Sequence, residues 1–301
     1  MRSQIQSFTD YLQNVKHTAK NTQLSYERDL RKMADYFEEK GITDIRSVTG
    51  DDLAAYISHM QDQGKRPSTL SRSIASIKAF YAFLIEQGVL QENIASSLKA
   101  PKVEKKLPSV MSLQDVDLLL AQPSGSSDKE IRDKAMLELL YATGIRVSEL
   151  LSLRLSDLNL KKSYIFVVSS QGRDRAIPIT RTARQSLDKY LKNVRSRMLN
   201  GKETDVLFVN CSGSAMSRQG FWKIIKFYAK KAGIEADITP NTLRHTFAAH
   251  LVSNGANIHA VQEMMGHADF SSTQRYAKIE GVLTEYENAH PREIQDHRAD
   301  E

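Results

Sequence analysis

The sequence is poor in the residues that cross-link a fold or bind metal through sulfur. Its 301 residues include one cysteine, Cys211, which excludes an internal disulfide and a cysteine-based metal site. Cys211 lies in "FVNCSG", a pattern typical of a strand that runs into a turn, so we expect no catalytic thiol there. No apolar run approaches the roughly 18 residues that span a bilayer, and the opening "MRSQIQSFTDYLQNV" is polar and amphipathic. We therefore expect a soluble, cytoplasmic protein.

Several common catalytic signatures are also missing from the sequence. The phosphate-binding G-x-x-x-x-G-K-[ST] loop and the serine elbow G-x-S-x-G are both absent. His245 and His250 are five residues apart, which does not place both on one helical face as the spacing in H-E-x-x-H does. No second cluster of metal-binding residues accompanies them. We therefore expect neither a metal site nor another cofactor.

What the sequence does have is length and an excess of positive charge. A hydrophobic content of 41% over 301 residues is enough to bury one large core or two smaller ones, and two domains are the better expectation. The formal net charge is +6. A basic surface of this size is compatible with solubility alone, but it also points toward a polyanionic partner.

The pattern of apolar residues divides the chain into two helical domains joined by a linker. Residues 1–98 predict short amphipathic helices, and Leu70, Ile74 and Ile77 mark the packed face of one of them. The stretch "LKAPKVEKKLPSVMS" predicts an extended linker over 99–112, before the second domain at 113–301. "YIFVVSSQGRDRAIPIT" predicts one β-hairpin, and "DVLFVN" is a candidate strand. The expected fold class is mainly α with a small β-sheet.

Two arginines in helical contexts are candidates for binding an anion. Arg146 follows Gly144 at a helix break in "ATGIRVSELLSL", where it would either pair with Glu149 or converge with Arg244 on one phosphate. In "NTLRHTFAAH" we expect Arg244 and His245 in the first turn of a helix. The N-terminal end of a helix is already positive, so a guanidinium beside it favours anions such as phosphate.

A histidine and a tyrosine follow these arginines in "MMGHADFSSTQRYAK". His267 comes directly after a glycine, and Tyr276 lies nine residues further on. A lone tyrosine after a Ser/Thr-rich helix start is ordinarily a half-buried packing residue. A tyrosine can also attack phosphorus when nearby positive charge favours the phenolate.

The three segments "ATGIRVSELLSL", "LRHTFAAHL" and "GHADFSSTQRYA", in this order and spacing, resemble the tyrosine recombinase (phage integrase) family, in particular its XerC/XerD-like members. The resemblance covers nearly the whole chain, including "NTQLSYERDL" and "ASIKAFYAFL" in the first domain. It implies a helical, SAM-like core-binding domain and an α+β catalytic domain that close around double-stranded DNA. The implied activity is site-specific recombination through a 3′-phosphotyrosyl intermediate. Its implied roles are chromosome or plasmid dimer resolution, linked to chromosome partition and cell division, or mobile-element integration.

The resemblance also implies a role for each candidate residue. Tyr276 would be the nucleophile, Arg146 and Arg244 would hold the non-bridging phosphate oxygens, and His267 would donate a hydrogen bond to the same phosphate. Neither a metal nor ATP is required. The segment "GVLTEYENAHPREI" resembles the tail helix that docks on a neighbouring protomer in a homo- or hetero-tetramer on DNA. Five basic residues are candidates for DNA contacts: Arg72, Lys78, Lys105, Lys106 and Arg218.

Two positions depart from the family pattern. Asn241 stands where the family has a histidine, and asparagine cannot exchange a proton near neutral pH. Ser170 stands where a hairpin lysine acts as general acid, and the nearby Arg173 or Arg175 would supply charge but is a poor proton donor. The departures leave open a catalytically attenuated or inactive DNA-binding protein of the same fold. A type IB topoisomerase is a more distant alternative.

Overall fold

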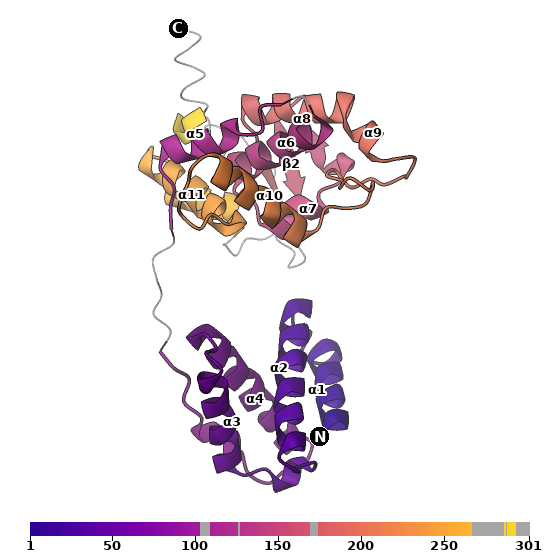
Figure 1. The fold of residues 1–301 in the computed structure, drawn as a ribbon, viewed down its shortest axis with the longest axis vertical. Coiled ribbons are helices and arrows are strands. Elements are labelled where there is room, and N and C mark those ends of the chain that lie inside the picture. Colours follow the sequence, from indigo (N-terminus) through magenta and orange to yellow (C-terminus); the bar gives the residue numbers. More distant parts are fainter. Residues whose placement is uncertain (103–108, 126, 169–173, 267–285, 287, 293–301) are drawn as a thin grey trace. The chain divides into compact units, whose positions relative to one another are not determined.

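The chain divides into two compact units, residues 1–106 and 107–301 (Figure 1). The computed structural model describes residues 1–102, 109–125, 127–168, 174–266, 286 and 288–292. Each unit has its own apolar core. Leu98 is buried in the first core and Met111 in the second, so the two ends of the predicted 99–112 linker pack on different units. The predicted domain boundaries themselves stay a prediction.

The first unit is built from helices (Figure 1). They pack through aromatic and aliphatic side chains. Its elements are α1 (Arg2–Asn14), α2 (Lys20–Glu39), the 3-10 helix η1 (Ile45–Ser47), α3 (Gly50–Asp62), α4 (Pro67–Glu86) and the 3-10 helix η2 (Ile94–Ser97). The predicted apolar stripe of α4 is confirmed, because Leu70, Ile74 and Ile77 are all buried. Ser76 on the same helix is also buried, and its hydroxyl donates to the Ser73 carbonyl at 2.8 Å. A small hydroxylated residue therefore fits the packed side of this helix.

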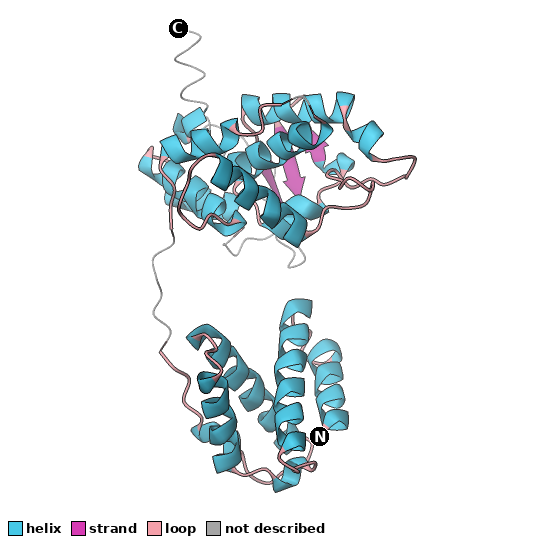
Figure 2. Ribbon diagram, viewed as in Figure 1, coloured by secondary structure: helices cyan, strands magenta, loops and turns pink. Residues whose placement is uncertain are grey.

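The second unit is mainly helical and contains a small antiparallel sheet (Figure 2). Its helices are α5 (Leu113–Ala121), α6 (Asp128–Thr143), α7 (Val147–Ser152), the 3-10 helix η3 (Leu155–Asp157), α8 (Arg181–Asn193), α9 (Arg195–Met198), α10 (Arg218–Lys231), α11 (Pro240–Ser253) and α12 (Ile258–Met265). The strands β1 (Leu158–Asn159), β2 (Tyr164–Val167) and β3 (Arg175–Pro178) pair in that order. The predicted fold class and hairpin are confirmed.

One helix organises the second unit. Nearly every residue of α6 from Ile131 to Thr143 is buried, and α6 packs against both α8 and α11. Because it is buried on all sides, α6 holds its own C-terminal end, where Arg146 follows, in a fixed place relative to α11, which carries Arg244.

The expected strand at "DVLFVN" and the expected lack of a membrane-spanning segment can both be compared with the structure. The segment "DVLFVN" forms isolated bridges, Val206 with Arg154 and Val209 with Ala215, and these pairings are too short to count as a strand. Among the described helices, none combines the length and the apolar composition that crossing a bilayer requires.

Candidate active site

The turn between α6 and α7 places Arg146 at a helix start. Gly144 ends α6 in the left-handed conformation, with a φ of 57°, and its N–H bonds to the Leu140 carbonyl. A β-carbon at Gly144 would lie 2.2 Å from a ring carbon of Phe247 on α11, so only glycine fits between the two helices. The chain then turns, and Arg146 becomes the N-cap of α7.

Arg244 reaches the same turn from α11. Thr239 caps this helix by accepting a hydrogen bond from the Thr242 N–H, and Pro240 is its first residue. Arg244 is the fifth residue and so lies in the second turn, which corrects our expectation of the first. The helix N-terminus therefore contributes less to binding an anion at Arg244 than we predicted, because the dipole effect is confined to the first turn.

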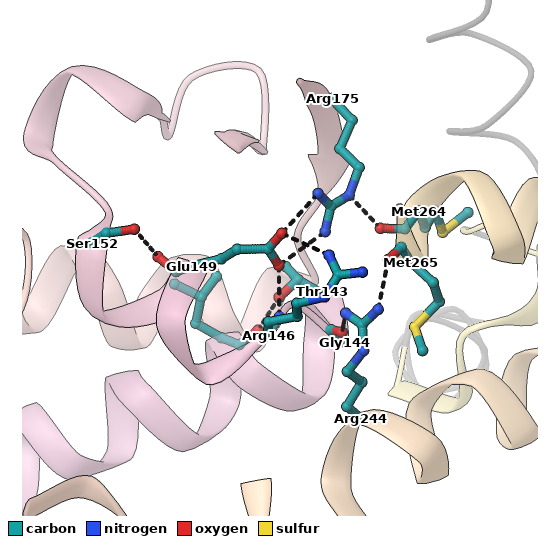
Figure 3. Close-up of polar contacts among 10 residues, drawn as sticks. Thr143, Gly144, Arg146, Glu149, Ser152, Arg175, Arg244, Met264 and Met265 are labelled. Atoms are coloured by element: carbon teal, nitrogen blue, oxygen red, sulfur yellow. Dashed lines mark hydrogen bonds and ion pairs between the residues drawn. The ribbon is translucent and has the colours of Figure 1, made fainter. Parts of the chain in front are cut away.

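The Arg244 guanidinium is buried and bridges two backbone carbonyls (Figure 3). Its Nη1 donates to the Gly144 carbonyl at 2.5 Å and its Nη2 to the Met265 carbonyl at 2.6 Å. Burial, followed by the nearby positive charge of Arg146, lowers the pKa of Arg244 to about 10. Arg244 thus remains a cation at neutral pH and is fixed between the α6–α7 turn and the end of α12.

Of the two contacts considered for Arg146, the structure shows the ion pair with Glu149, and the side chain also keeps access to solvent. Its backbone N–H donates to Glu149 Oε2 at 2.7 Å, and its Nη1 donates to Glu149 Oε1 at 3.0 Å. The Arg146 side chain is 40% exposed, whereas that of Glu149 is 8% exposed. The carboxylate therefore orients the arginine from the buried side and leaves its outer edge accessible.

Arg175 is a third guanidinium in the site, which sequence reasoning noted only as a possible substitute charge. Its Nη1 and Nη2 each donate to Glu149 at 3.1 Å, and its Nε donates to the Met264 carbonyl at 2.6 Å (Figure 3). Burial alone would raise the pKa of Glu149, but the hydrogen bonds and charges of Arg175 and Arg146 outweigh burial and lower it. Three cations thus surround one carboxylate, and the site has an excess of two positive charges that favours an anion.

The remaining predicted catalytic positions fall into two groups. Asn241 and His245 are described, and both are exposed on α11, whereas Arg244 between them is buried. Ser170, Arg173, His267 and Tyr276 lie outside the described residues. His267 follows Gly266 directly, and Gly266 adjoins the carbonyl that Arg244 binds.

Both ring nitrogens of His250 are within hydrogen-bonding distance of groups in the protein interior. Its Nδ1 lies 2.9 Å from the Tyr141 hydroxyl, and its Nε2 lies 3.0 Å from the Met111 carbonyl. Burial lowers the pKa of His250, which favours the neutral ring at physiological pH. Within the described part of the chain, no three His, Cys, Asp or Glu side chains gather closely enough to hold a metal ion.

The candidates for DNA contacts differ in their local partners. Arg72 forms a two-point ion pair with the buried Asp29, at 2.7 and 3.0 Å. The Lys78 Nζ donates to the Ser96 carbonyl at 3.0 Å. Arg218 is the first residue of α10 and is exposed, and Lys105 and Lys106 lie outside the described residues. DNA contact stays a prediction for all five.

The described part of the predicted tail segment packs on its own chain. The Tyr286 hydroxyl donates to the Ala142 carbonyl at 2.8 Å, and Arg292 pairs with Glu138 at 3.2 Å and Asp117 at 3.0 Å. His290 is fully buried, and burial, followed by the charge of the adjacent Arg292, lowers its pKa to about 3. The predicted docking of this tail on a neighbouring protomer stays a prediction.

Comparison with known proteins identifies the family. Residues 109–281 match the phage integrase family, and residues 5–88 match the N-terminal SAM-like domain of phage integrases. The chain belongs to the phage integrase family of tyrosine recombinases. Tyrosine recombinase XerD from Listeria monocytogenes serotype 4b is 39% identical over 296 residues, covering 97% of this chain and 100% of the relative. Tyrosine recombinase XerD from Oceanobacillus iheyensis is 40% identical over 293 residues, covering 96% and 98%.

Solved structures share the fold of this tyrosine recombinase. The XerH site-specific recombinase bound to its difH substrate, in a pre-cleavage complex, has a TM-score of 0.69 at 20% identity and covers 98% of this chain and 84% of that one. A lambda integrase dimer bound to a COC′ core site has a TM-score of 0.68 at 18% identity, with coverage of 96% and 95%. The two-domain recombinase architecture predicted from the sequence is therefore confirmed.

Two features of the candidate site were not predicted from the sequence, namely the burial of Arg175 and the backbone acceptors at the end of α12. Arg175 begins β3 and is buried, although an arginine beside a polar turn ordinarily faces solvent. The C-terminal end of α12 supplies the carbonyls of Met264 and Met265 as acceptors, which no side-chain pattern reveals. The apolar run that follows Arg175, "AIP", was the one signal that its strand enters the core.

Proposed function

We propose that this protein recombines DNA at specific sites, with Tyr276 as the nucleophile. The observation that carries the proposal is the joining of Arg146 and Arg244 at one turn, where Gly144 links the two (Figure 3). Two guanidiniums at such a place match the need of a phosphoryl transition state for donors on its non-bridging oxygens. The relatives named tyrosine recombinase XerD support the same conclusion across nearly the full length.

The proposed reaction exchanges one phosphodiester for another. The Tyr276 oxygen attacks the scissile phosphorus, the bond to the 5′ oxygen breaks, and a 3′-phosphotyrosyl link and a 5′-hydroxyl remain. The hydroxyl of the partner strand then attacks the phosphotyrosyl link and releases the tyrosine. Arg146 and Arg244 neutralise the charge on the phosphate in both steps, and His267 donates a hydrogen bond to it. The bond count is unchanged throughout, so the reaction needs no external energy source.

The biological role we propose is resolution of chromosome or plasmid dimers in the cytoplasm. The full-length relatives carry the XerD name, which favours this role over mobile-element integration. We also propose assembly as a tetramer on DNA, with the predicted tail segment 281–294 docked on a neighbouring copy. A lambda integrase tetramer bound to a Holliday junction, with a TM-score of 0.68 at 19% identity, shares the fold and supports this assembly by analogy.

A second candidate function is DNA binding with weakened cleavage. Asn241 is exposed at the start of α11 and cannot act as a proton acceptor near neutral pH. Arg175 does not replace the missing hairpin lysine, because its guanidinium donors are directed to Glu149 and Met264. Loss of general acid–base help costs about 10²- to 10⁴-fold in rate and leaves phosphate binding intact.

One experiment separates the two functions. A nicked suicide duplex with the host's candidate recombination site is incubated with the wild type, Tyr276→Phe, and the double variant Ser170→Lys/Asn241→His. A covalent protein–DNA band in the wild type that is absent in Tyr276→Phe supports the recombinase. A salt-sensitive gel shift without that band, together with a band in the double variant, supports the weakened DNA-binding protein. Covalent product with Tyr276→Phe contradicts the proposed nucleophile.

A further inference from the structure

Arg175 is a buried cation of the second unit that the proposed reaction does not use. It lies at the first position of β3, and its side chain is 7% exposed. Three of its donors contact two elements, Glu149 on α7 and the Met264 carbonyl at the end of α12. These partners are 26 and 89 residues away along the chain, so Arg175 joins three separate segments at one point.

The end of α12 depends on this contact. The last carbonyls of a helix have no partner within the helix, and α12 has no basic residue of its own in its last turn. Arg175 binds the Met264 carbonyl, and Arg244 binds the next carbonyl, that of Met265. Two guanidiniums thus cap an eight-residue helix, where positive charge also interacts favourably with the helix dipole.

Gly266 directs the chain away from this cap. It has a left-handed φ of 67°, and a β-carbon there would lie 3.1 Å from the Arg175 Cζ and Nη1. The backbone at Gly266, where the chain leaves α12, therefore lies directly against the Arg175 guanidinium. The next residue in the chain is His267. The position from which the His267–Tyr276 segment starts is consequently set by Arg175 on one side and Arg244 on the other.

We infer that Arg175 is a positioning residue for cleavage. It holds the end of α12 and Gly266, from which the chain continues to His267 and Tyr276, in place beside the Arg146–Glu149 pair. The inference rests on the proposed function of Tyr276. Arg175 acts through Glu149 and the Met264 carbonyl and does not contact the phosphate itself.

The chemistry of the contact predicts how substitutions behave. Lysine at this position keeps the charge but is a single point donor, so it cannot bind Glu149 through two nitrogens and Met264 through a third. Glutamine removes the charge and leaves Arg146 as the cation that still donates hydrogen bonds to Glu149. Both variants should loosen the end of α12, and glutamine should do so more. A displacement of about 1 Å at a reacting group costs about 100-fold in rate.

The test combines single-turnover cleavage, DNA affinity and hydrogen exchange on Arg175→Gln and Arg175→Lys. Arg154→Gln is the matched control, because Arg154 forms a 2.8 Å ion pair with Asp205 on the exposed surface of the same unit. At saturating protein we expect cleavage of the suicide duplex to fall about 100-fold in Arg175→Gln and less in Arg175→Lys. We expect the dissociation constant for DNA to change by less than about threefold, and amide exchange to rise over 258–266 but not over 181–193.

Three outcomes would overturn the inference. The first is wild-type cleavage by Arg175→Gln with unchanged exchange in α12. The second is a parallel loss of DNA affinity and of protection throughout the unit in both variants, which would mark a purely structural role. The third is equal rates for Arg175→Lys and wild type. If the wild type itself forms no covalent complex, the proposed function fails, and the exchange data still decide whether Arg175 holds α12.

Discussion

Substitution of Gly144 by alanine tests the close packing that brings the two arginines together. The new methyl group would lie 2.2 Å from the Phe247 ring carbon Cδ1, well inside contact distance, and the φ of 57° would be strained for any residue with a β-carbon. Because the Gly144 carbonyl accepts the Arg244 hydrogen bond, any shift that relieves the overlap also moves the Arg244 acceptor.

The expected destabilisation has two parts. Placing alanine in the left-handed region costs about 1–2 kcal/mol. Forcing an extra methyl group into a packed core costs about 1–3 kcal/mol more. Gly233 provides the matched control, since it also follows a helix of the second unit, has a φ of 72°, and has nothing within 4 Å of a built β-carbon. Gly233→Ala should therefore lose only the stability that alanine costs in the left-handed region, about 1–2 kcal/mol.

Guanidinium unfolding followed by tryptophan fluorescence measures both variants. Trp222 is the sole tryptophan and lies on α10, so the signal reports on the second unit. We expect Gly144→Ala to lose about 1–3 kcal/mol more than Gly233→Ala. Equal losses would show that the Phe247 ring moves aside freely and would refute the packing argument. A cleavage rate unchanged in Gly144→Ala would refute the claim that this turn sets the position of Arg244.

Three further predictions concern charged and titratable groups. Burial keeps His290 neutral, so its contribution to stability is full above about pH 6.5 and is lost as the pH falls toward 3. The free energy of unfolding, measured in urea, should therefore fall between pH 7.5 and pH 5 by about 2 kcal/mol less in His290→Gln than in the wild type. Arg72→Gln should lower the stability of the first unit by about 2 kcal/mol in thermal unfolding, because it leaves the buried Asp29 carboxylate without its partner. Adding Asp29→Asn should restore most of that stability, and no recovery would contradict the ion-pair argument. Glu149→Gln removes the anion among three guanidiniums, so the melting temperature should fall and inorganic phosphate should partly restore it, whereas a phosphate-independent loss would argue against an anion site.

Local patterns were sufficient to predict the fold class. The spacing of Leu70, Ile74 and Ile77 reports directly on the buried face of α4, because helical periodicity is a property of neighbouring residues. The hairpin was predicted for the same reason, since its strands and turn are continuous in the chain. "DVLFVN" was less predictable, because its apolar run packs without a continuous partner strand.

For the described residues of the candidate site, the sequence predicted a contact between near neighbours but not the contacts across the fold. Arg146 and Glu149 are three residues apart, and their ion pair follows from the start of α7. The pairing of Arg175 with Glu149 and with the Met264 carbonyl depends on contacts across the fold, and backbone acceptors leave no trace in a sequence. The second-turn position of Arg244 depended on where the Thr239 cap begins the helix, a boundary that shifts by a residue or two in any prediction.

The residues that flank the 267–285 segment limit how far the proposed nucleophile, Tyr276, can lie from the arginines, and so set its effective concentration. Gly266 is fixed beside the arginines and Tyr286 is fixed to α6, and Tyr276 is ten residues from each. Ten residues of fully extended chain span at most about 35 Å, so the phenol stays within that radius of the site whatever path the segment takes. One molecule in a sphere of that radius corresponds to a concentration on the order of 10 mM. The protomer that supplies the arginines therefore supplies its own tyrosine at a concentration that a tyrosine from a separate molecule in solution would not reach.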